Sequence, residues 1–178
     1  MRARNKGLKR REFFEVGLTA AAAGTLAACS RAGGGDYWRF FTAHEARTVD
    51  AICEQIIPAD DDPGAAQAEV VKFIDRQLTG HYSRHQAAYR AGLARVDEAS
   101  GAKFGKRFVE LAFDEQTEVL LELEQNDREF FGLLRDHTMQ GFYGDPRHGG
   151  NRDAVSWKML ELPFPPVRGR WHYTQEAG

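Results

Sequence analysis

The chain has 178 residues, with 24 Lys and Arg against 26 Asp and Glu, which gives a formal net charge of −2. Residues 1–28 hold six basic and two acidic side chains, so this +4 segment leaves the other 150 residues near −6. These 150 residues are enough for one domain with a hydrophobic core. Its acidic balance excludes nucleic acid as a partner, because nucleic-acid binding requires a basic surface.

The first 28 residues have the pattern of an export signal. Arg10 and Arg11 precede two phenylalanines and a moderately apolar run over residues 16–28, in the manner of a twin-arginine signal. The run ends in Leu-Ala-Ala before Cys29, which predicts a lipobox whose cysteine is acylated. A transmembrane anchor, the alternative, needs roughly 20 apolar residues, and this run is far shorter. We therefore expect a periplasmic lipoprotein that leaves by the twin-arginine route and is held to the membrane by its acyl chains.

A flexible, lipidated tether is expected over residues 29–41, because the three glycines at 33–35 favour many backbone conformations. Folding should begin near Phe41. Cys53 is left alone once Cys29 is acylated, so we expect no disulfide within the mature chain. The helical spacing of Cys53 with apolar neighbours predicts a small core side chain rather than a reactive thiol.

Helical periodicity predicts an all-α fold, a bundle of five or six helices over residues 42–163 followed by an irregular arm rich in Gly and Pro over 164–178. The first helix begins with a capping box of Thr42 and Glu45 and stops before Pro58. No stretch has the sustained alternation of a β-strand. Five more helical segments are expected: one over 70–78 that ends at Gly80, one over 82–100 closed by Ser100-Gly101, a short one over 104–111, one capped by Asp114 that breaks at Asn126-Asp127, and one from there to Gly141.

Residues 141–151 form a dense cluster of turn-forming residues, Gly-Phe-Tyr-Gly-Asp-Pro-Arg-His-Gly-Gly-Asn. Glycines at this density allow backbone conformations that other residues avoid. An anion cradle is one interpretation, but the Lys-Ser/Thr pair and following helix of a phosphate-binding loop are missing. The favoured interpretation is an ordered loop that presents Tyr143, Arg147 and His148 to another protein, since aromatic and Arg side chains are effective interface anchors.

The C-terminal arm combines prolines with Phe164, Trp171 and Tyr173. Prolines at this density hold a chain extended. A frayed terminus is the alternative, although frayed termini rarely carry three large aromatic side chains. We expect the arm to dock, either on its own domain or on a partner.

No combination of side chains predicts catalysis, cofactor binding or metal binding by this chain. His81 and His85 could present two imidazoles one helical turn apart, but a zinc site needs three or four ligands. The aspartates at 60–62 lack the periodic ligands and closing Glu of a calcium loop, so they predict a hydrated turn. The candidate acid–base groups, for which no partner is apparent, are Glu45, Glu54 and His137.

Four motifs together resemble the gluconate 2-dehydrogenase subunit 3 family, the small or gamma subunits of membrane-associated sugar and polyol dehydrogenases. They are Phe-Thr-Ala-His-Glu at 41–45, Ile-Ile-Pro-Ala-Asp at 56–60, the glycine-rich loop at 141–151, and Trp157-Lys158. The resemblance spans roughly residues 41–163, which is nearly all of the predicted folded part.

The resemblance implies a helical accessory subunit that carries the export signal for a flavin-dependent large subunit of the glucose-methanol-choline type. FAD is then expected on that large subunit and haem on a separate cytochrome c subunit, with no cofactor on this chain. The lipobox departs from the type member of the family and suggests membrane tethering. An independent envelope lipoprotein that binds a small sugar or acts as a scaffold is the alternative.

Overall fold

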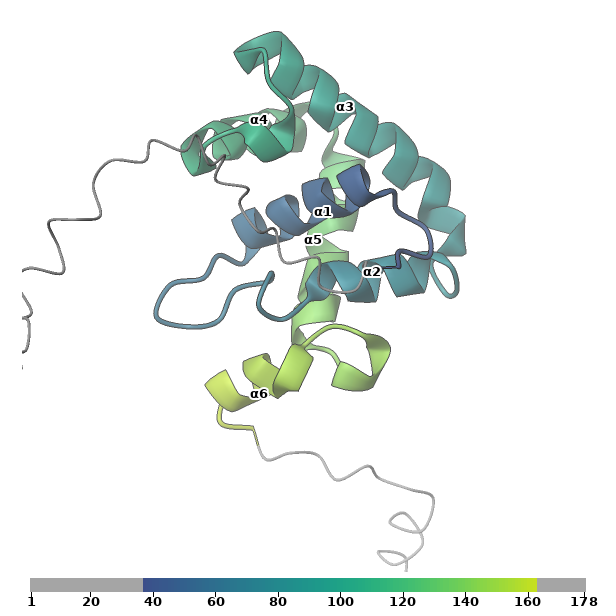
Figure 1. Cartoon of the computed structure of the whole chain (residues 1–178), viewed down its shortest axis with the longest axis vertical. Helices are drawn as coiled ribbons and strands as arrows, with labels where there is room; N and C mark the ends of the chain where they lie inside the picture. Colours follow the sequence, from purple (N-terminus) through teal and green to yellow (C-terminus); the bar gives the residue numbers. More distant parts are fainter. Residues whose placement is uncertain (1–36, 163–178) are drawn as a thin grey trace, which may run out of the picture. The chain divides into compact units, whose positions relative to one another are not determined.

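The computed structural model describes residues 37–162, which form α-helices and short 3-10 turns and contain no strand. The predicted all-α fold is confirmed, with six helices in this part of the chain (Figure 1). Their bounds are α1 (Ala43–Ile56), α2 (Val70–Leu78), α3 (Gln86–Phe104), α4 (Phe113–Asn126), α5 (Arg128–Tyr143) and α6 (Val155–Met159).

Helix α1 lies at the centre of the core and contacts α2, α3, α4 and α5. Its start is the predicted capping box: the Thr42 hydroxyl accepts from the Glu45 amide at 3.2 Å, and the Glu45 carboxylate accepts from the Thr42 amide at 2.8 Å. Val49, Ile52 and Cys53 on this helix have no exposed surface. The core assignment of Cys53 is therefore confirmed, and burial raises the pKa of its thiol to about 12.

Helices α2 and α5 pack closely because a glycine of α5, Gly141, lies where the two helices meet. A Cβ atom on Gly141 would lie 2.9 Å from Val70 Cγ1 and 3.0 Å from Phe73 Cδ1. The first distance is shorter than real Cβ contacts and the second is tighter than most of them, so a side chain at this position would push the two helices apart. Figure 1 shows α6 beside the C-terminal end of α5, and the segment between them folds back toward α2.

The folded part begins before Thr42, because the carboxylate of Asp75 on α2 binds the segment that precedes α1. It accepts from the amides of Arg39 at 2.8 Å and of Phe40 and Phe41 at 3.0 Å. Phe41 is buried, although the sequence places it in a tether over 29–41. Sequence composition cannot reveal this contact, since Asp75 lies 34 residues beyond Phe41. The predicted signal peptide, Cys29 and the glycines at 33–35 lie outside the described residues.

Several predicted helix boundaries differ from those of the structure. Helix α3 continues through Ser100 and Gly101 to Phe104, because the Ser100 hydroxyl donates to the Val96 carbonyl within the helix and Gly105 supplies the left-handed terminus at φ 68°. The helix expected over 104–111 is only a 3-10 turn, Phe108–Glu110.

Helix α4 has Ala112 as its N-cap rather than Asp114, since the Glu115 carboxylate binds the Ala112 amide at 2.8 Å. The break at Asp127 is confirmed: its side chain accepts from the Phe130 amide at 3.3 Å and caps α5. Helix α5 then extends two residues past Gly141, so Tyr143 ends a helix instead of lying in the loop.

Candidate functional site

The glycine-rich loop after α5 is held against α2 by its backbone. Arg76 donates to the Arg147 carbonyl at 2.9 Å, and the Arg152 amide donates to the Ala68 carbonyl at 3.1 Å. Gly149 has φ 110° and lies over the backbone of Lys72, a conformation that favours glycine. The loop is therefore ordered, as the sequence predicts, and its glycines serve close packing.

Asn151 fixes the loop from inside. Its side chain is fully buried. The side-chain amide nitrogen donates to the Gly144 carbonyl at 2.9 Å, and the side-chain oxygen Oδ1 accepts from the Ser156 amide at 3.0 Å. Beside it, the Trp157 indole donates to the Tyr143 carbonyl at 2.9 Å. These bonds join α5, the loop and α6 into one unit.

The side chains of Arg147 and His148 are exposed on this ordered loop, and that of Tyr143 is exposed at the end of α5. Arg147 donates to both oxygens of the Asp145 carboxylate, from Nε to Oδ1 at 3.0 Å and from Nη2 to Oδ2 at 2.6 Å, and these bonds hold the pKa of Asp145 below its ordinary value. This pairing orients the guanidinium along the loop. The other predicted docking residues, Phe164, Trp171 and Tyr173, lie outside the described residues.

An open groove of about 740 Å³ lies between α2 and α5, next to the loop. Sequence reasoning missed it, because its two walls come from residues more than 50 positions apart. It contains two of the predicted docking residues and is lined mainly by aromatic, imidazole and amide side chains: Phe73, Gln77, His81, Tyr82, Met139, Gln140, Tyr143 and His148, with the backbone of Gly144.

His137 lies buried behind the groove and supports its floor. Its ring stacks on Tyr82, with centroids 4.0 Å apart and planes at 5°, and lies 5.8 Å from Tyr89 at 10°. The Tyr89 hydroxyl is 2.9 Å from His137 Nδ1. Burial lowers the pKa of His137 to about 4, and the neighbouring His85 acts in the same direction. A neutral imidazole nitrogen can accept a hydrogen bond from the Tyr89 hydroxyl, so His137 serves as a packing and hydrogen-bonding residue.

The chain matches one known protein family over most of its described residues. Residues 43–163 match the model of the family described as gluconate 2-dehydrogenase subunit 3. The chain belongs to this family. Its members are subunits of a multi-subunit dehydrogenase complex, so this subunit 3 protein is an accessory subunit of such a complex. No curated protein and no solved structure matches the chain.

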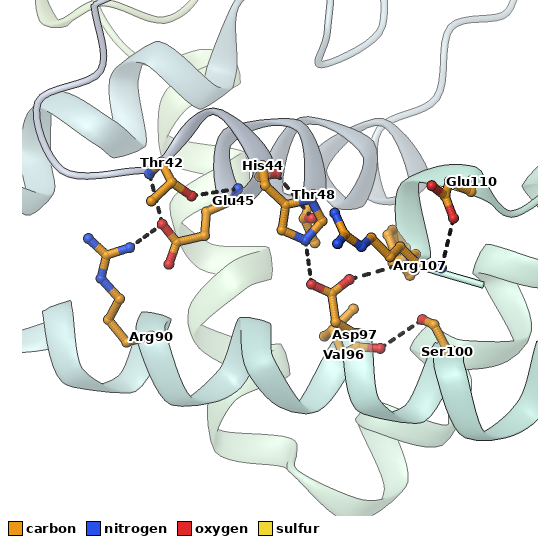
Figure 2. Close-up of polar contacts among 11 residues, drawn as sticks. Thr42, His44, Glu45, Thr48, Arg90, Val96, Asp97, Ser100, Arg107 and Glu110 are labelled. Atoms are coloured by element: carbon orange, nitrogen blue, oxygen red, sulfur yellow. Dashed lines mark hydrogen bonds and ion pairs between the residues drawn. The ribbon is translucent and has the colours of Figure 1, made fainter. Parts of the chain in front are cut away.

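Two of the candidate acid–base groups in this subunit 3 protein have structural partners. Figure 2 shows the Glu45 carboxylate of α1 bound to the Arg90 guanidinium of α3. Burial alone would raise the pKa of Glu45, but its hydrogen bonds to Arg90 and Thr42 outweigh burial and lower the pKa. Glu54 accepts from the amides of Ala59 at 2.8 Å and Ala66 at 2.9 Å and closes the loop after α1.

Sequence reasoning missed a second link between α1 and α3. His44 Nε2 lies 2.5 Å from Asp97 Oδ2 (Figure 2). The other carboxylate oxygen of Asp97 accepts from the Phe108 amide at 3.4 Å. Neither residue lies in the groove.

Metal ligands do not gather in the described part of the chain. His81 lies in a turn and His85 ends a 3-10 turn, so the two are not successive positions of one α-helix. Across residues 37–162, no group of three or more His, Cys, Asp or Glu is arranged to hold a metal ion. Asp60 accepts from the Asp62 amide at 2.8 Å within an exposed turn. Within the same residues, no helix has the length and apolar character needed to cross a membrane.

The stability of the subunit should decline in acid because of His137. Its pKa of about 4 in the folded state lies below the ordinary value of 6.5, so the unfolded chain takes up the proton first as the pH falls. This contribution is fully present above about pH 6.5 and is lost toward pH 4, with a total of about 3 kcal/mol. Urea unfolding at several pH values measures it. His137→Gln, which keeps an acceptor for Tyr89, should show a flatter dependence; equal slopes in the two proteins would contradict the assignment.

Proposed function

We propose that this chain is the non-catalytic small subunit of a periplasmic, membrane-associated dehydrogenase that oxidises a sugar or polyol, as gluconate 2-dehydrogenase does. In this proposal it escorts a large subunit of the glucose-methanol-choline type through twin-arginine export and stabilises the assembled complex. FAD belongs to the large subunit, and haem to a separate cytochrome c. The observation that carries the proposal is the family match over residues 43–163.

We assign partner binding to a docking surface of Tyr143, Arg147 and His148 together with the arm residues Phe164, Trp171 and Tyr173. The support from the structure is that the first three side chains are exposed while their backbone is fixed to α2 and α6. A fixed backbone loses little conformational entropy on binding. Tyr, Trp and Arg are also the residue types that dominate interface energetics.

The docking surface is tested by Arg147→Ala combined with Trp171→Ala. Arg147 bonds only to Asp145 through its side chain, so the helicity and melting temperature of the isolated subunit should barely change. Recovery of the large subunit on the tagged chain should fall, because losing an anchor costs about 2 kcal/mol or more, roughly thirtyfold in affinity. Purification from envelope fractions, with detection of bound flavin, measures the recovery.

Arg47→Ala is the matched control, since Arg47 is an exposed arginine on α1 with no ion pair among the described residues. It should leave recovery of the large subunit unchanged. A stable double variant with normal recovery would eliminate the docking surface. Absence of any bound flavoprotein on the unchanged chain would favour the independent lipoprotein.

Cys29→Ser tests the lipid anchor separately from the fold. The change removes the thiol that is acylated, so labelled palmitate should no longer be incorporated and the mature domain should leave the membrane fraction. The helical domain should keep its melting temperature, because the buried core described among residues 37–162 does not involve Cys29. Continued labelling together with membrane retention would refute the lipobox.

A further inference from the structure

The groove between α2 and α5 has the walls of a site for an extended, uncharged peptide. Met139 and Tyr143 of α5 contribute exposed apolar surface, and the edges of the buried Phe73 and Tyr82 rings line the groove from the α2 side. The lining contains no carboxylate, lysine or arginine. Its volume of about 740 Å³ falls within the roughly 300–1,000 Å³ typical of ligand pockets.

The floor of the groove is rigid before anything binds. Tyr82 is stacked on the buried ring of His137, and its hydroxyl donates to the Gln140 side-chain oxygen. The Gln140 amide nitrogen and the whole Gln77 side-chain amide have no hydrogen-bond partner among residues 37–162. Fixed aromatic rings with free amide donors between them are the features that bind polyproline II segments, whose carbonyls are unsatisfied.

The described chain ends beside this groove. The Leu162 amide donates to the Trp157 carbonyl at 2.8 Å, and the Trp157 indole donates to the carbonyl of Tyr143, a groove residue. The next five residues, 163–167, read Pro-Phe-Pro-Pro-Val and carry no charge. An extended chain advances about 3.3 Å per residue, so a few residues are enough to enter the groove.

We propose that residues 163–167 of the same chain occupy the groove as a polyproline II segment, with the ring of Phe164 against Tyr82 and Met139. Three observations favour this occupant over a second copy or a foreign peptide. The segment has the proline content and neutrality that the lining fits, it starts next to the groove, and its covalent link gives an effective concentration on the order of millimolar. Phe164 then anchors the arm on its own domain, and Trp171 and Tyr173 are the arm residues that remain for the large subunit; that last assignment rests on the proposed function, whereas occupation of the groove does not.

Methionine-methyl NMR on the full chain in detergent micelles tests the occupant directly. Met139 lies in the groove, and the chain has three methionines, so the spectrum is simple. Phe164→Leu should shift the Met139 methyl resonance and remove its contacts to one aromatic ring. Trp171→Leu, the matched control outside the segment, should leave both unchanged. A Met139 resonance that ignores Phe164→Leu would overturn the proposal.

A cysteine pair distinguishes this chain from a second copy. In the Cys29→Ser background, Met139→Cys with Val167→Cys should oxidise to a disulfide within one chain, and Cys53 should not compete because it is buried. Gln125→Cys on α4 with Val167→Cys is the control pair and should stay reduced. Disulfides between two chains would assign the groove to a second copy. Equal oxidation of both pairs would show an arm without a fixed site. Both results would overturn the proposal, and neither depends on the large subunit.

Discussion

Replacing Arg10 and Arg11 by lysine is expected to leave both this chain and its large subunit in the cytoplasm. The translocase recognises the arginine pair, and lysine keeps the charge but not the planar guanidinium. The proposed function makes the two fates depend on one signal, because the large subunit is taken to travel folded with its escort. Fractionation with detection of both polypeptides measures the effect, which should approach complete loss from the periplasm.

Arg2→Lys with Arg4→Lys is the matched control, since it makes the same chemical change before the motif. Both polypeptides should then be exported as in the unchanged strain. Normal export of the large subunit alongside a cytoplasmic Arg10→Lys, Arg11→Lys chain would refute the escort role, while leaving the accessory role in the assembled complex open.

Sequence patterns predicted the local features of the fold because those features depend on neighbouring residues. The capping box of Thr42 and Glu45 and the break at Asp127 each involve side chains three residues from the amides they bind. The boundary at Ser100 was wrong because a buried hydroxyl can bond to a carbonyl within its own helix. Asp75, which binds three amides more than 30 residues away, could not be predicted from spacing.

The candidate site also combines features that local sequence predicts with features that depend on the packing of distant residues. An ordered loop at 141–151 follows from its glycines, and the exposure of Arg147 and His148 follows from their polarity. The groove depends on how α2 packs on α5, and the stack of Tyr82 on His137 joins residues 55 positions apart. No periodicity in the sequence encodes such contacts, so His137 was predicted as a lone acid–base candidate.

Gly150 separates the two roles of the loop, packing and docking. A Cβ atom at this position would lie 2.3 Å from the Gly141 carbonyl oxygen and 3.0 Å from Phe73 Cβ. Both neighbours are held by helix backbones, so neither can move aside at low energetic cost. The loop that carries Arg147 and His148 would have to detach from α2.

Gly150→Ala should therefore destabilise the isolated subunit by about 3 kcal/mol, near the upper end for overpacked sites, and also reduce recovery of the large subunit. Arg147→Ala with Trp171→Ala should reduce recovery alone, so the pair of results distinguishes a distorted surface from a missing anchor. Gly132→Ala is the matched control: no atom lies within 4 Å of its Cβ position on α5, and it should stabilise the helix by roughly 0.5–1 kcal/mol. Thermal unfolding and recovery are measured on each variant. A Gly150→Ala chain as stable as the unchanged one would mean that the loop leaves α2 without cost, and Arg147 and His148 would then have no fixed frame for docking.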